Sequence, residues 1–237
     1  MKNLTLILTL FLLLWVSSVI AQEEREYETD GTPVVDRLVD GRSLNGIFAY
    51  REIVGEDNYA CFWIVGDSGL VLRYRGEDGI GYPDVKELRR YLGDPVHDSL
   101  LDPSHNLLSV SFAPYDDQKG WIVGFVNGGL DKWKGVIYKT TDGGMNWTLQ
   151  YPNIEPGEKI PCLKVQAINE DVVWVSCGHG YVLTTTNGGA TWLRTNKPGG
   201  ENHFGWLWGI SSPYFNNDYA WVCSDQSGLF ANKSYLK

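Results

Sequence analysis

Two eight-residue stretches decide the fold of this chain: Thr140-Thr141-Asp142-Gly143-Gly144-Met145-Asn146-Trp147 and Thr185-Thr186-Asn187-Gly188-Gly189-Ala190-Thr191-Trp192. In each stretch an Asp or Asn side chain can accept hydrogen bonds from the amides of a tight turn, and two glycines tolerate positive φ. The tryptophan that follows is expected to pack between neighbouring sheets. We expect two structural turns, built from Thr141, Asp142, Gly143, Gly144 and Trp147 and from Thr186, Asn187, Gly188, Gly189 and Trp192.

An apolar segment led by tryptophan recurs four times around these turns. Its markers Trp63, Trp121, Trp174 and Trp221 are 58, 53 and 47 residues apart. Strand-like runs precede and follow each marker, and a repeat of this length is typical of propeller blades rather than of helical or leucine-rich solenoids. The sequence therefore predicts an all-β protein, a β-propeller of about four blades.

The repeats divide the chain into four units, residues 41–106, 107–155, 156–200 and 201–237. A fourth, outer strand is legible in the second and third units alone, and the last unit has none of its own. We favour an incomplete or open propeller, because closing a ring with four full blades demands steep packing angles. The alternative is a ring closed by a strand from the N-terminal segment 22–40. Between the first two units, Val85, Leu88 and Leu92 follow a helical spacing, and they predict one short helical insertion over residues 84–93.

The N-terminus has the features of a signal peptide over residues 1–21. Lys2 precedes an apolar run from Leu4 to Trp15, and small residues at Val19 and Ala21 fit a cleavage site. We expect a secreted or periplasmic protein with no membrane span after cleavage. The formal net charge of −9 becomes −10 when Lys2 is removed, and such an acidic chain is a poor partner for nucleic acid.

The unit from Leu107 to Tyr151 combines the Gly-Trp-Ile-Val-Gly strand at Gly120 with the turn that begins at Thr140. Both turns look like Asp-boxes, also called BNR repeats, and this unit resembles the repeats of photosystem II stability and assembly factor-like proteins, the Ycf48-like family. The resemblance implies an exported propeller that acts as an assembly scaffold for a protein partner, without catalytic residues. It does not extend to a role in photosynthesis.

An enzyme is the alternative, because Asp-boxes also occur in sialidases and other glycosidases. A sialidase site needs several arginines for the substrate carboxylate, yet Arg194 is the one arginine after residue 90. A glycosidase needs two carboxylates, for which Asp67, Asp117, Asp171 and Asp225 stay open. We therefore favour a non-catalytic binding module without a cofactor, and keep a carbohydrate-binding or glycoside-cleaving module as the second hypothesis.

No metal site is expected. The densest cluster of candidate ligands, His97, Asp98, Asp102 and His105, has the composition of a turn.

The run from His203 to Ile210 is the most aromatic segment of the chain. As a regular strand it would place Trp206, Trp208 and Ile210 on one face, which favours packing between sheets. The alternative makes His203, Trp206 and Trp208 ligand-facing at the end of an inner strand, stacked on a sugar ring or a partner's side chain.

Cysteine positions suggest one disulfide. Cys162 and Cys177 fall opposite each other in a predicted hairpin, at a distance that a disulfide can bridge. Cys61 and Cys223 are expected to be small buried hydrophobic residues.

Overall fold

The computed structural model describes residues 42–54, 57–77, 101–114, 116–129, 132–151, 159–195, 205–212, 219–225 and 228–233. These residues form strands, turns and one single-turn 3₁₀ helix, η1 (Gly178–Gly180). Segments 1–21 and 22–40 and the helix expected over 84–93 lie outside the described residues. Among the residues that the structure describes, no helix has the length and apolar character needed to cross a membrane.

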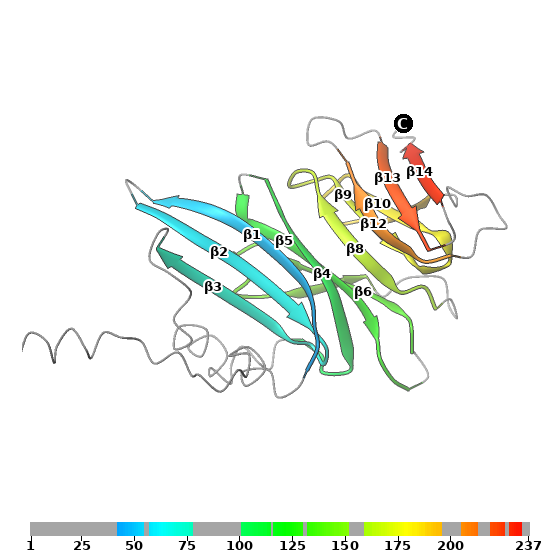
Figure 1. The fold of residues 1–237 in the computed structure, drawn as a ribbon, viewed down its shortest axis with the longest axis horizontal. Helices are drawn as coiled ribbons and strands as arrows, with labels where there is room; N and C mark the ends of the chain where they lie inside the picture. The colour runs from blue at the N-terminus through cyan, green and yellow to red at the C-terminus, as the bar shows by residue number, and fades with distance from the viewer. Residues whose placement is uncertain are drawn as a thin grey trace, which may run out of the picture. The chain divides into compact units, whose positions relative to one another are not determined.

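The strands form four antiparallel sheets that follow one another along the chain (Figure 1). Sheet A contains β1 (Leu44–Val54), β2 (Asp57–Gly66) and β3 (Val71–Glu77). Sheet B contains β4 (His105–Ala113), β5 (Asp116–Val126), β6 (Gly135–Thr140) and β7 (Thr148–Tyr151). Sheet C contains β8 (Cys162–Ala167), β9 (Val173–Cys177), β10 (Val182–Thr185) and β11 (Leu193–Thr195). Sheet D contains β12 (Leu207–Ser211), β13 (Tyr219–Ser224) and β14 (Gly228–Lys233).

Each sheet is an up-and-down meander, as in a propeller blade, so the all-β class and the propeller-type repeat are confirmed. A fourth strand is present in sheets B and C, where the turns at 141–147 and 186–192 lead into β7 and β11. In the described residues, sheets A and D have three strands each. An incomplete or open propeller is compatible with this count.

The hydrophobic core lies between the sheets and consists of three clusters. Trp63 of sheet A packs with Leu107, Val110 and Phe112 of sheet B, and its ring stacks on Phe112 at a centroid distance of 5.3 Å. The second and third clusters are built in the same way around Trp121, which packs on sheet C, and Trp174, which packs on sheet D. Trp63, Trp121 and Trp174 therefore each join their own sheet to the next one, and all three are buried.

The first strand of every sheet carries a β-bulge at the same place. Its pairing with the second strand skips Asn45 in β1, Leu108 in β4, Leu163 in β8 and Trp208 in β12. A bulge leaves one residue unpaired and turns its side chain away from the regular alternation. The four sheets thus share one register, which makes their positions directly comparable.

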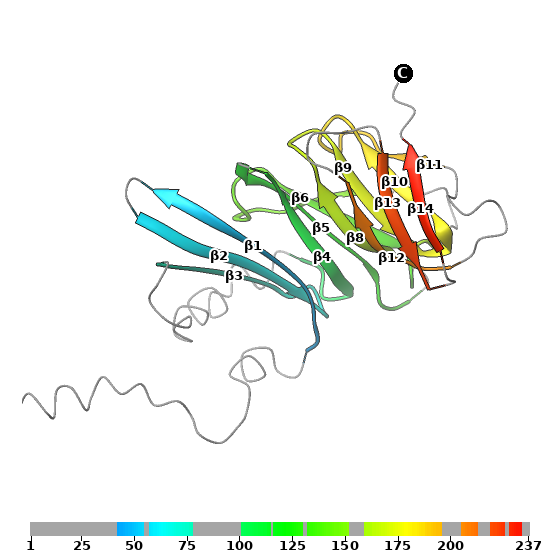
Figure 2. The ribbon, with the colours of Figure 1, turned by 45° about the horizontal axis from the view of Figure 1, so that its top comes forward.

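Hydrogen bonds also couple the first strands of neighbouring sheets, which succeed one another as β1, β4, β8 and β12 (Figure 2). The hydroxyls of Ser109 and Ser111 accept the amides of Val165 and Ala167 at 3.3 and 3.1 Å. The side-chain amide of Gln166 pairs with Ser212, donating to its carbonyl at 3.0 Å and accepting its amide at 2.7 Å. The polar residues of these strands are therefore used at the contacts between sheets.

His105 makes the stability of the fold depend on pH. Its Nδ1 lies 2.7 Å from the Tyr138 hydroxyl and its Nε2 lies 3.8 Å from the Asp102 carboxylate. Burial lowers the pKa of His105 below 6.5 and outweighs the opposing attraction of Asp102. Because the unfolded chain binds a proton at a pH where the folded chain does not, the free energy of unfolding should rise with pH below about 6.5 and level off above it.

Urea denaturation between about pH 5 and about pH 8 measures this dependence. His105→Asn should be less stable at high pH and show a shallower rise below about pH 6.5. An unchanged slope in the variant would assign the pH dependence to other groups.

Candidate functional site

Each sheet has two distinct ends. The turns between first and second strands and between third and fourth strands lie at one end, which we call the box end. The turns between second and third strands lie at the other end, beside the start of the first strand of the next sheet. Backbone hydrogen bonds fix this relation, for example from Gly69 to the His105 carbonyl at 2.7 Å and from Gly180 to the Gly205 carbonyl at 2.8 Å.

The turn at 140–147 is held by two side chains. The Thr140 hydroxyl accepts the amides of Gly144 at 2.8 Å and Asp142 at 3.3 Å, and donates to the Asp142 carboxylate at 2.8 Å. That carboxylate also accepts the backbone and side-chain amides of Asn146 at 2.9 and 2.8 Å. Burial alone would raise the pKa of Asp142, but the hydrogen bonds from Asn146 and Thr140 hold it below its ordinary value.

The turn at 185–192 repeats this geometry with Asn187 in place of the aspartate. The Thr185 hydroxyl accepts the Gly189 amide at 2.8 Å, and the Asn187 carbonyl oxygen accepts the Thr191 amide at 2.9 Å. The Asn187 side-chain amide donates to the Thr191 hydroxyl at 2.8 Å. The backbone hydrogen bonds of the turn are therefore kept although the charge is lost.

The turn threonine lies one residue earlier than the sequence indicated. Thr140 and Thr185 are buried and make the hydrogen bonds, whereas Thr141 and Thr186 are exposed. In both turns the hydroxyl comes from the last residue of the preceding strand, β6 or β10.

The glycines of both turns have positive φ, between 62° and 86°. The second glycine of each turn, Gly144 or Gly189, lies against the preceding sheet. A Cβ on Gly144 would come within 2.1 Å of the Trp63 ring, and Trp147 meets the same ring edge-on at a centroid distance of 5.9 Å. The Gly188 carbonyl accepts from Lys139 of sheet B at 2.8 Å. These turns therefore join sheets B and C to the sheets that precede them.

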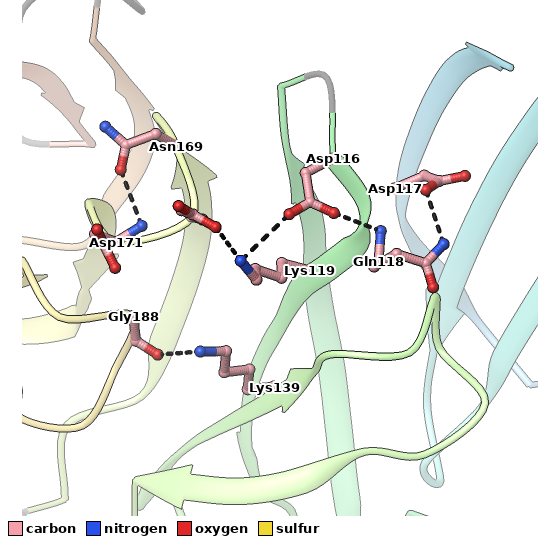
Figure 3. A network of polar contacts seen from close by, with 9 residues as sticks. Asp116, Asp117, Gln118, Lys119, Lys139, Asn169, Asp171 and Gly188 are labelled. Carbon is pink, nitrogen blue, oxygen red and sulfur yellow. Dashed lines mark hydrogen bonds and ion pairs between the residues drawn. The ribbon is translucent and has the colours of Figure 1, made fainter. Parts of the chain in front are cut away.

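A polar network extends this connection across the box end between sheets B and C (Figure 3). Lys119 pairs with Asp116 of its own sheet at 3.5 Å and with Glu170 of sheet C. Figure 3 also shows Lys139 pointing toward the Gly188 carbonyl, below the contacts of Lys119. The contacts of Lys119 and Lys139 therefore connect sheets B and C at this end.

The four carboxylates considered for glycoside cleavage are divided between the two ends. Asp117 and Asp171 belong to the box end, whereas Asp67 and Asp225 lie in turns at the opposite end. Asp67 accepts the side-chain amide of Asn45 at 2.8 Å, and Asp225 accepts the backbone amide of Trp206 at 2.9 Å. The fold thus separates these two pairs.

The end opposite the boxes carries an aromatic cluster. Trp206 and Trp208 stack with a centroid distance of 5.5 Å and an interplanar angle of 13°, and Trp133 meets Trp206 edge-on at 5.7 Å. Trp133 in turn stacks on buried Phe125 at 4.7 Å. We call Trp133, Trp206 and Trp208 the tryptophan shelf. Trp133 is 39% exposed and Trp208 is 55% exposed.

The shelf joins two sheets that are not neighbours in the chain, since Trp133 belongs to sheet B and the other two tryptophans to sheet D. The corresponding turns of sheets A and C are tight, with Ser68-Gly69 and His179-Gly180 at positive φ as in two-residue hairpins. The β5–β6 turn is longer and places Trp133 at φ 74°. A bulky residue in this region is strained, and such strain is concentrated at functional sites.

The bulge in β12 decides how the aromatic run is oriented. A regular strand would bury Trp208 and expose Leu207, but Leu207 is fully buried and Trp208 points to solvent. The favoured interpretation of this face as packing between sheets is therefore wrong for Trp208, because the unpaired residue reverses the alternation. Trp206 is half-buried, and His203 lies outside the described residues.

Sequence reasoning named Trp206 and Trp208 and missed Trp133. The available signal was the Asn127-Gly128-Gly129 segment, which lengthens this turn relative to those of the first and third repeats. The shelf also has a cation at its margin, because the Lys132 ammonium lies 5.5 Å from the centre of the Trp133 ring. Flat apolar rings with one adjacent cation can bind apolar or planar groups of a ligand.

Cys162 and Cys177 are paired across β8 and β9 as free, buried thiols whose sulfurs lie 4.0 Å apart. Burial raises the pKa of the Cys177 thiol. A disulfide between them stays a prediction. Cys61 is buried, but the expectation that Cys223 is buried is wrong, because this thiol is exposed.

Comparison with known proteins places these sheets beside solved propellers. YCF48 from Cyanidioschyzon merolae is 18% identical with a TM-score of 0.45, covering 83% of this chain and 58% of that chain. YCF48 bound to D1 peptide is 14% identical with a TM-score of 0.46, covering 83% and 56%. The GH74 xyloglucanase from Xanthomonas campestris is 10% identical with a TM-score of 0.48, covering 73% and 25%.

The chain therefore spans a little over half the length of the two YCF48 structures. The resemblance to Ycf48-like propellers expected from the sequence is also found among solved structures. No family model matches the chain, and no curated protein matches it.

The turn at Asp142 provides a test of the structural role of the box end. Asp142→Ala leaves the Asn146 amide without its acceptor and should lower the free energy of unfolding by about 1–3 kcal/mol. Asp142→Asn should cost less, because Asn187 accepts the equivalent amide in the second turn. Urea denaturation of both variants measures the difference. Equal losses would mean that the carboxylate charge, rather than the amide acceptor, holds the turn.

Proposed function

We propose that this chain is a non-catalytic, exported binding module that holds another protein at the tryptophan shelf. One observation carries the proposal: three tryptophans from two non-neighbouring sheets meet at one end of the strands, and two of them are exposed. Exposed aromatic clusters of this kind mark interaction sites, because burying them on a partner is favourable.

The arrangement of the rings favours a protein over a sugar. Trp206 and Trp208 stack on each other, and Trp133 and Trp206 form a T-shaped pair. The three rings therefore cover part of one another's surface. The exposed parts of Trp133 and Trp208 remain available to a partner, with the Lys132 ammonium beside the Trp133 ring. Tryptophan-rich surfaces with a nearby cation are typical of the energetic centre of protein interfaces.

The division of the acidic residues supports a non-catalytic module. A glycosidase needs two carboxyl groups facing each other across the scissile bond, at a separation of roughly 5–10 Å. Asp225, beside the shelf, is engaged by the Trp206 amide, and Asp117 and Asp171 belong to the other end of the sheets. Binding of a carbohydrate at the shelf is the second candidate, since the exposed face of Trp208 could stack on a sugar ring.

Export is part of the proposal and rests on the apolar run from Leu4 to Trp15 and on the small residues at Val19 and Ala21. The mature protein should then begin at Gln22. N-terminal sequencing of the protein recovered from the extracytoplasmic fraction tests this. Recovery of the chain with Met1 in the cytoplasmic fraction would contradict it.

Binding through the shelf is tested by affinity capture from the native envelope fraction. Immobilised wild-type protein and Leu193→Ala, which removes an exposed leucine on the outer strand of sheet C, should retain the same protein. Trp133→Ala and Trp208→Ala should weaken its retention about tenfold or more, because each removes a large side chain from the centre of the contact.

Parallel binding to a glycan array separates the two candidates. Retention of a protein that depends on the shelf supports the proposal. Glycan binding lost in Trp208→Ala, without such a protein, would replace it with the carbohydrate module. Hydrolysis of aryl glycosides, abolished by substitution of one carboxylate, would overturn the non-catalytic assignment.

A further inference from the structure

The contact between neighbouring sheets has two sides, which the shared register allows us to compare. We call the marker tryptophan of the second strand and the residue two positions later the forward face, since they pack on the next sheet. In sheets A, B and C these pairs are Trp63 and Val65, Trp121 and Val123, and Trp174 and Ser176. All six residues are buried.

The forward face of sheet D is uncovered. The residues at the same positions in sheet D are Trp221 and Cys223. The register fixes this equivalence, because the residue just before each bulge pairs with Gly66, Gly124, Cys177 or Ser224, three positions after the marker tryptophan. Trp221 is 45% exposed and Cys223 is exposed, whereas Trp63, Trp121 and Trp174 are at most 3% exposed. The marker tryptophan is thus buried in sheets A, B and C and exposed in sheet D.

The opposite side of the contact is uncovered on sheet A. We call the residue just before the bulge of the first strand and the residue three positions later the backward face, which receives the preceding sheet. In sheet B these are Leu107 and Val110, both buried against Trp63. Their equivalents in sheet A are Leu44, which is 39% exposed, and Ile47, which is 62% exposed.

We propose that the forward face of sheet D docks on the backward face of sheet A of a second copy of this chain. The two uncovered faces are the two halves of a contact that the chain already makes three times, with an indole on one side and aliphatic residues on the other. Surfaces that use different patches on the two copies form a heterologous, head-to-tail contact.

Sedimentation velocity over a range of concentrations tests the proposal. The wild-type protein should self-associate, and Trp221→Lys and Ile47→Lys should each be monomeric at concentrations where the wild type is not. Both side chains are exposed, so both variants should fold, which circular dichroism and thermal melting check. Leu193→Lys, at an exposed leucine outside both faces, should associate like the wild type.

Mixing the two monomeric variants distinguishes head-to-tail docking from other arrangements. Trp221→Lys keeps an intact backward face and Ile47→Lys keeps an intact forward face, so an equimolar mixture should form a dimer that neither variant forms alone. A wild-type protein that is monomeric at all concentrations would overturn the proposal. So would association that survives Ile47→Lys, or a mixture that stays monomeric.

Discussion

The packing of one tryptophan per sheet on the next sheet is the interaction on which the rest of the structure depends. Trp63, Trp121 and Trp174 are buried between successive sheets, and each belongs to a different core cluster. Burying a tryptophan removes roughly 150–250 Å² from water, worth about 4–6 kcal/mol at about 25 cal/mol per Å². An isolated three- or four-stranded meander has too little core of its own, so each sheet is stabilised by its neighbour rather than by itself.

The box end complements this packing with directional contacts. The second glycine of each turn, Gly144 or Gly189, allows the turn backbone to approach the preceding sheet, where a side chain would collide with Trp63 or Gln150. Lys139 contributes twice, because its ammonium lies 5.3 Å from the centre of the Trp121 ring and donates to the Gly188 carbonyl of the next sheet. The turn motif therefore connects neighbouring sheets. Its presence in a sequence predicts the fold but gives little information about function.

The candidate site arises where the chain departs from its own repeat. The β5–β6 turn is longer than its counterparts and carries Trp133 at positive φ, and the β12 bulge presents a tryptophan where the other sheets have Asn45, Leu108 and Leu163. A repeated scaffold supplies rigid positions, and insertions at its turns supply the chemistry. The two departures lie at the same end of sheets B and D, where the Trp133 and Trp206 rings are in contact.

The sequence by itself determined the fold class, the number of repeats and the residues at which neighbouring sheets meet, because glycine turns, apolar strands and marker tryptophans are local patterns that recur at a regular spacing. It also indicated Trp206 and Trp208 as exceptional. It did not determine that Thr140 and Thr185, rather than the next residues, close the turns, nor that a bulge exposes Trp208 and buries Leu207. Only the tertiary structure decided that Trp133 joins the shelf, since that contact links two sheets that are not adjacent in the chain. Pattern and spacing describe neighbours along the sequence, whereas a bulge and a contact between distant turns depend on how the sheets pack.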